Sequence, residues 1–118
     1  MEDNKIKNWL GKKVKVVMDR PLGSKHPDKK FDTIYPINYG FIPNTLSLAD
    51  NEPIDAYVLG PTEPLKEFKG VVIAGILRED DGEIKLVVSD GQDYSREEIE
   101  KLTYFQEKYH KSGVYKLE

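Results

Sequence analysis

Short apolar runs separated by polar and turn-forming residues extend along most of the chain. Val14–Met18 has apolar residues at every second position, a period typical of a strand. Three further runs predict strands, over Ala56–Leu59, Val71–Leu77 and Lys85–Val88. The last two are joined by an acidic turn at Asp81 and Gly82, a pattern that predicts a β-hairpin.

One segment near the C-terminus has helical spacing instead. Ser95 with Glu98 three residues later is the pattern of a capping box at a helix start. An apolar stripe follows at helical spacing, formed by Ile99, Leu102, Phe105 and Tyr109. Gly113 is expected to end this helix, which would place three basic residues in its last turn, Lys108, His110 and Lys111. A short final strand is expected over Val114–Leu117.

The remaining segments predict loops. Prolines and a glycine break Arg20–Asp32, and Asn44–Pro53 is rich in turn residues. Ile34–Pro43 is apolar and aromatic but has prolines near both ends, so we expect an irregular extended segment and not a central strand. Trp9 is expected to anchor the N-terminal segment against the core. Five or six strands with one helix predict a mainly β (α+β) fold, a small closed or half-closed barrel.

Length and composition narrow the class of protein. The chain has 118 residues and no cysteine, which predicts one domain over residues 1–118 without disulfides or thiolate ligands. No apolar run approaches the ~20 residues that cross a bilayer, and no leader pattern is present. We therefore expect a cytoplasmic protein with no membrane partner.

Charge is distributed unevenly. The net charge is −3, which argues against a nucleic-acid partner. Met1–Lys30 has nine basic and four acidic residues, a balance of +5, whereas Asp50–Glu83 has nine acidic and three basic, a balance of −6. The two segments could meet at a site that holds cations and an anion together, or they could be separate solvated surfaces.

Two clusters of carboxylates could bind metal. Asp50, Glu52 and Asp55 lie close together in sequence, and like charges this close repel unless a cation intervenes. Oxygen ligands favour Mg²⁺, with Mn²⁺ possible, over Zn²⁺. The second cluster surrounds the acidic turn and comprises Glu79, Asp80, Asp81 and Glu83. Both clusters could instead be solvated turns.

Several side chains could bind phosphate. The basic candidates are Arg20, Lys25, Lys85 and Lys111, and the phenolic donors are Tyr39 and Tyr109. His26 could bind phosphate or metal. Taken alone, each of these residues is more typical of a surface cation, an exposed loop histidine or a tyrosine at the edge of the core.

Two contiguous stretches, IYPINYGFIPNTL over Ile34–Leu46 and ADNEPIDAYVLGPTEPL over Ala49–Leu65, resemble the soluble family I inorganic pyrophosphatases. That family has a PxNYGYI stretch, then a D-G-D-P-x-D loop, a short apolar strand and a Pro-Leu turn. Weaker similarity continues to FQEKYHK near the C-terminus. The resemblance implies a five-stranded barrel of the OB type with one C-terminal helix packed on it, and possibly a homo-oligomer.

The resemblance also implies roles for individual residues. Metal would be bound by Asp50, Glu52, Asp55, Asp81 and Glu83, with Asp80 as a rival to Asp81. Glu52, where the family has Asp, would be the general base, and Asp55 and Lys85 would complete the catalytic group. Phosphate would be bound by Arg20, Lys25, Tyr39, Lys85, Tyr109 and Lys111, although His110 stands where the family has lysine. Asp19 stands where the family has an acid before a proline.

Three functions are compatible with these residues. The first is metal-dependent hydrolysis of inorganic diphosphate, in which divalent ions activate water and neutralise the phosphates. The second is hydrolysis of another phosphoanhydride, such as a nucleotide. The third is a non-catalytic binding module of the OB type, although its usual basic groove is hard to reconcile with the net negative charge.

Overall fold

The computed structural model describes residues 6–46 and 52–116. Its elements in chain order are β1 (Lys13–Arg20), β2 (Asn38–Ile42), β3 (Ile54–Val58), β4 (Glu67–Arg78), β5 (Ile84–Ser89), α2 (Arg96–Glu107) and β6 (Ser112–Lys116). No described helix has the length and apolar character needed to cross a membrane.

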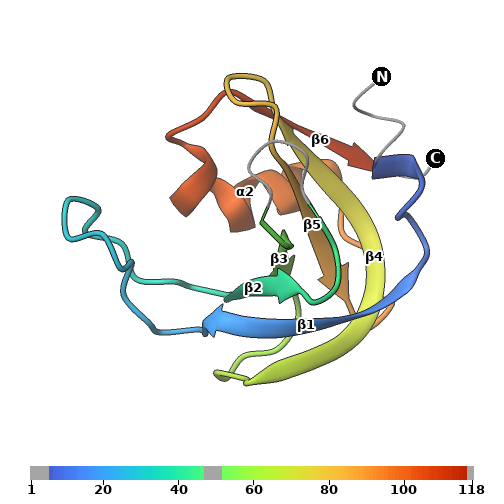
Figure 1. Ribbon diagram of the computed structural model, residues 1–118, viewed down its shortest axis with the longest axis horizontal. Helices are drawn as coiled ribbons and strands as arrows, with labels where there is room; N and C mark the ends of the chain where they lie inside the picture. Colours follow the sequence, from blue (N-terminus) through green and yellow to red (C-terminus); the bar gives the residue numbers. More distant parts are fainter. Residues whose placement is uncertain (1–5, 47–51, 117–118) are drawn as a thin grey trace.

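The first five strands close into a barrel, as predicted. Their order in the sheet is β1-β2-β3-β5-β4, and β4 returns to pair with β1. This closure is possible because β4 is 12 residues long: its first half pairs with β1 and its second half with β6. All pairings are antiparallel except that of β3 with β5. Figure 1 shows the long, curved β4 along one side of the barrel, with α2 and the β1–β2 loop on the other.

The prediction that Ile34–Pro43 is not a central strand was wrong. β2 occupies Asn38–Ile42 and pairs with both β1 and β3, while Pro36 and Pro43 lie just outside it and cost no ladder hydrogen bond. A glycine lets this strand lie close to β1: a Cβ on Gly40 would lie 2.0 Å from the carbonyl oxygen of Val17. The NYG sequence is therefore a structural requirement as well as a motif.

The hairpin between β4 and β5 was predicted correctly. The two strands pair antiparallel, and Gly82 occupies the tight turn between them with a positive φ of 73°. The backbone N–H of Gly82 donates to the carbonyl of Arg78 at 2.8 Å.

The start of α2 was predicted correctly but its end was not. Ser95 is the N-cap and forms the full capping box with Glu98. The helix ends at Glu107 with Lys108 as its C-cap, so the last turn contains no basic residue, and Gly113 lies in β6. Tyr109 has helical spacing in sequence but follows the helix.

The barrel strands carry apolar residues on both faces. One face packs against α2 through Tyr57, Val87 and Ile99. The other holds a second cluster, including Ala56, Val58, Leu86 and Val88, against which Trp9 packs. Because side chains alternate along a strand, Asp55 and Lys85 lie on the same face as Tyr57 and Val87, toward α2.

Candidate active site

A buried lysine joins two carboxylates at the centre of the site. Asp55 and Lys85 are register partners in the parallel pair β3–β5. The Nζ of Lys85 lies 2.5 Å from Oδ2 of Asp55 and 2.6 Å from Oε1 of Glu83, and the lysine is 3% exposed. Glu83 immediately precedes β5, so the acidic turn does converge with Asp55 on one cationic group.

Tyr39 completes this cluster from β2. Its hydroxyl donates to Oδ2 of Asp55 at 2.9 Å. Burial and then the charge of Asp55 raise the pKa of Tyr39 well above its ordinary value. Tyr39 therefore stays protonated and serves as a hydrogen-bond donor.

Arg20, at the end of β1, lies over the aromatic wall of the site. Its guanidinium carbon lies 5.7 Å from the ring centroid of Tyr35 and 5.5 Å from that of Tyr39. Its Nη1 donates to the hydroxyl of Tyr35 at 2.5 Å, and that hydroxyl donates to Oε1 of Gln106 at 2.5 Å. These contacts connect Arg20 to the last turn of α2.

Arg78 at the end of β4 connects the same helix to Glu83. Its Nε and Nη2 donate to the two carboxylate oxygens of Glu107, at 3.0 and 2.8 Å. Its Nη1 donates to Oε2 of Glu83 at 3.2 Å. Nothing in the sequence near Arg78 indicated this role, because its partner Glu107 lies 29 positions away.

Several of these groups line a pocket of about 210 Å³. Its lining includes five residues that the sequence predicted, Arg20, Tyr39, Asp55, Lys85 and Tyr109. His26, considered as a phosphate or metal ligand, also lines it. The sequence did not indicate the remaining members, Phe31, Thr33, Arg78, Phe105 and Gln106, or that His110 lines the pocket. The pocket thus combines three cationic side chains with a carboxylate and an aromatic rim.

Other predicted site residues are not brought together there. The pocket lining formed by the described residues includes neither Lys25 nor Lys111. Lys25 is exposed, and Lys111 forms an exposed ion pair with Glu79 at 3.5 Å. Glu52 is exposed and belongs to the loop before β3, and Asp50 lies outside the described residues.

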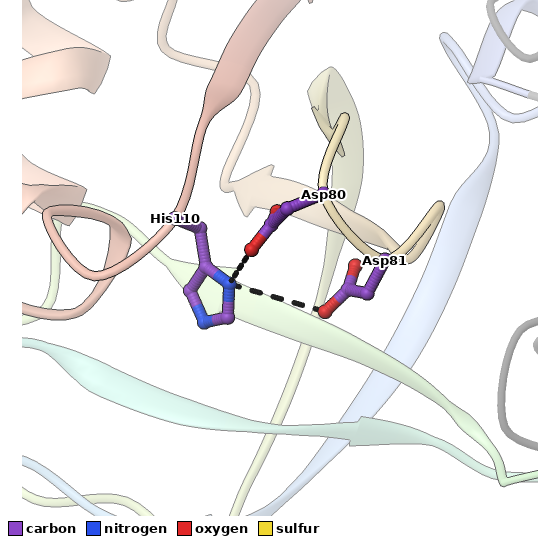
Figure 2. A group of neighbouring side chains, drawn as sticks. All are labelled: Asp80, Asp81 and His110. Carbon is purple, nitrogen blue, oxygen red and sulfur yellow. Dashed lines mark hydrogen bonds and ion pairs between the residues drawn. The ribbon is translucent and has the colours of Figure 1, made fainter.

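The acidic turn also faces His110, as Figure 2 shows. Nδ1 of His110 lies 2.9 Å from Oδ2 of Asp80 and 3.9 Å from Oδ2 of Asp81. The hydrogen bond to His110 lowers the pKa of Asp80. One ligand atom from each of the three residues lies within 4.8 Å of the others, although both acids are exposed. Asp81 also accepts the backbone N–H of Glu83 at 2.9 Å, so it shapes the turn.

The donor set of the central cluster fits a hard divalent cation. Asp55 and Glu83 offer only oxygen, and their carboxylates already share one cationic group, the ammonium of Lys85. Asp80 and Asp81 extend the acidic edge next to Glu83. Asp55 and Glu83 meet at Lys85, whereas Asp80 and Asp81 face His110, so the acids form two groups that offer oxygen ligands.

Comparisons with known proteins all identify the same family. The family model described as inorganic pyrophosphatase matches residues 6–113. Inorganic pyrophosphatase 2 of Pseudomonas syringae pv. tomato is 46% identical over 50 residues, covering 41% of this chain and 27% of that protein. An inorganic pyrophosphatase of Caulobacter vibrioides is 44% identical over 54 residues, covering 44% of this chain and 30% of that protein. The matched segment thus spans less than a third of the length of either relative.

Solved structures show the same fold. The inorganic pyrophosphatase of Ehrlichia chaffeensis superposes with a TM-score of 0.68 at 18% identity, covering 91% of this chain and 87% of that one. That of Thermus thermophilus superposes with a TM-score of 0.61 at 21% identity, covering 88% and 82%. Since the family model extends over most of the barrel and α2, the chain belongs to the inorganic pyrophosphatase family.

Proposed function

We propose that this protein hydrolyses inorganic diphosphate to two phosphates in a metal-dependent reaction. The observation that carries the proposal is the convergence of Asp55 and Glu83 on Lys85, next to a pocket whose lining includes Asp55, Lys85, Arg20 and Tyr39. Diphosphate is small and highly charged, so its hydrolysis requires cations close to a group that activates water. Membership of the pyrophosphatase family supports the same reaction.

Within this proposal, the cations and phenols of the pocket bind the phosphates. Lys85, Arg20, Tyr39 and Tyr109 all line it. Tyr39 can donate only while it is protonated, and its raised pKa maintains that state across the physiological range. Lys25 and Lys111 lie outside the lining, and we propose that they assist phosphate binding only through the attraction of their charge.

The proposed metal ligands are the acids at the centre and edge of the site. Asp55, Glu83 and Asp81 would hold Mg²⁺, or Mn²⁺, together with Asp50 and Glu52, which precede β3 in the sequence. When bound, the ion supplies positive charge against phosphate oxygens and activates water. Glu52 is proposed as the general base that accepts the proton of the attacking water.

We also propose a cellular location, a domain organisation and an oligomeric state for the enzyme. We place it in the cytoplasm, which the lack of cysteine supports, as a single domain over residues 1–118. A homo-oligomer is a further expectation. Size-exclusion chromatography with light scattering would measure its mass.

The test is phosphate release from diphosphate, with and without Mg²⁺, by the protein and two variants. Asp55→Asn preserves shape but removes the charge, and we expect its rate to fall by about a hundredfold or more. Lys101→Met, an exposed lysine on α2, is the control and should retain the full rate. No release by the unsubstituted protein with any divalent metal, or faster turnover of a nucleoside triphosphate than of diphosphate, would overturn the proposal.

A further inference from the structure

The last turn of α2 places a buried carboxylate behind the pocket. Glu107 is 7% exposed, and it is separated from the pocket by Arg78, which lines it and is 6% exposed. Both oxygens of Glu107 accept from Arg78, and Oε2 also accepts from the hydroxyl of Tyr57 at 2.5 Å. This carboxylate is therefore bonded by donors from two barrel strands, Tyr57 of β3 and Arg78 of β4.

The charge state of Glu107 is well defined. Burial alone would raise its pKa, but the hydrogen bonds and charge of Arg78, with the bond from Tyr57, outweigh burial and lower the pKa below its ordinary value. Arg78 stays protonated next to it. The two side chains therefore form a neutral pair in which the orientation of Arg78 is fixed at two of its nitrogens.

The third contact of Arg78 shows why this pairing matters. Its Nη1 reaches Glu83 at 3.2 Å, on the opposite side of the guanidinium from Glu107. Glu83 also accepts from Lys85 at 2.6 Å on its other oxygen, so each of its two oxygens bonds a cationic side chain. If Glu107 were neutral, the positive charge of Arg78 would be balanced by Glu83 alone.

We infer that Glu107 is a positioning residue that balances most of the charge of Arg78 and limits its contact with Glu83 to a single bond, which keeps the negative charge of Glu83 available to a divalent cation. This inference rests on the proposed role of Glu83 in metal binding. It assigns the end of α2 a function in the site that goes beyond packing on the barrel.

A neighbouring contact shows that this end of the helix acts on both sides of the pocket. Gln106 donates to the hydroxyl of Tyr57 at 2.9 Å and accepts from that of Tyr35, which bonds Arg20. One turn of α2 thus holds Arg20 through Gln106 and Arg78 through Glu107. A substitution at 107 that only loosened this turn would disturb both cations.

The test uses Glu107→Gln, which preserves the shape of the side chain and removes its charge. Calorimetry would measure the binding of Mg²⁺ and, separately, of inorganic phosphate. We expect Mg²⁺ affinity to fall by about tenfold, because one uncompensated charge next to a carboxylate shifts its affinity for a cation by about that factor. Phosphate affinity should rise, because Arg78 gains effective positive charge. If the substitution only loosened the last turn of α2, the affinities for Mg²⁺ and for phosphate would both fall.

Two further variants control this experiment. Thr103→Val alters a buried residue of α2 whose hydroxyl donates to the carbonyl of Ile99 within the helix, and it should leave both affinities unchanged. The double variant Arg78→Met with Glu107→Gln removes both charges and should bind Mg²⁺ within about threefold of the unsubstituted protein. Replacing a buried pair by neutral residues is often tolerated, so this variant also provides the test if Glu107→Gln fails to fold.

The outcomes separate the inference from the proposed function. Unchanged Mg²⁺ affinity in Glu107→Gln, a parallel loss of Mg²⁺ and phosphate binding, or a tenfold loss of Mg²⁺ affinity in the double variant would each overturn the inference alone. Failure of the unsubstituted protein to bind Mg²⁺ would overturn the metal role of Glu83 and the inference with it.

Discussion

The wall of the pocket and its rim are built in different ways. Tyr39, Asp55 and Lys85 come from three paired strands, and the register of the barrel fixes their positions. Phe31 and Tyr109 come from the β1–β2 loop and the segment after α2, and they meet through ring centroids 4.8 Å apart. Tyr109 is 48% exposed, whereas Lys85 is 3% exposed. The wall therefore consists of buried or half-buried polar and charged groups held by strand pairing, whereas the rim lies where the pocket meets solvent.

The largest expected effect is on stability, and it concerns the buried ion pair between Arg78 of β4 and Glu107 of α2. Arg78→Met would leave Glu107 buried without its cation, and breaking such a pair costs about 3–5 kcal/mol of unfolding free energy. Urea unfolding measures this change. Lys111→Met, which breaks an exposed pair with Glu79, is the control and should change stability by less than about 0.5 kcal/mol. If the two variants lost the same free energy of unfolding, burial of the Arg78–Glu107 pair would add nothing to its contribution to stability.

Lys85→Met tests the wall directly. It removes the ammonium that Asp55 and Glu83 share, and we expect kcat/KM for diphosphate to fall by about a hundredfold. Steady-state rates with saturating Mg²⁺ measure this. A fall of less than about threefold, the size expected for an exposed lysine, would place the phosphate site elsewhere.

Phe31→Ala tests the rim. Removing the ring that packs on Tyr109 should widen the entrance and raise the rate with tripolyphosphate relative to diphosphate by about fivefold. Tyr104→Ala is the matched control, since this tyrosine of α2 is 63% exposed and lies outside the pocket lining that the described residues form. If both variants changed the ratio equally, the rim would have no special part in selecting substrate length.

The smallest effect is a pH dependence of stability. Because the pKa of Glu107 is lower in the folded protein than in the unfolded chain, its stabilising contribution is complete above pH about 5 and is lost as the pH falls through the folded value. The difference in unfolding free energy between the protein and Glu107→Gln should therefore shrink as the pH falls from about 5 to about 3. A constant difference over this range would mean that Glu107 is not ionised in the folded protein.

The sequence identified the wall better than the rim. Asp55 was recognisable as a member of a cluster of acids and Lys85 as the basic residue after the acidic turn, and the pairing of β3 with β5 brings them together. β2 was missed because prolines near its ends are informative only once the strand boundaries are known. Tyr109 was placed in the helix because its spacing fits, although the chain leaves the helix at Lys108.

Charge alone predicted the residues of the pocket less well. Lys25 and Lys111 were chosen for their sign, and neither lines the pocket that the described residues form. Arg78 and Glu107 could not be recognised as a pair, because nothing in a single sequence indicates which distant acid and base will share a buried position. Their contact depends on α2 packing across the end of β4.

The parallel pairing of β3 with β5 has a consequence for folding kinetics. β4 lies between these strands in the chain, so Asp55 meets Lys85 only after β4 has turned back and β5 has docked between β3 and β4. Pairings of this non-local kind are slow to form. Recovery of phosphate binding during refolding should therefore coincide with barrel closure and lag behind local hairpin formation. A chain halted before β5 docks would contain every residue of the site and have none of its affinity.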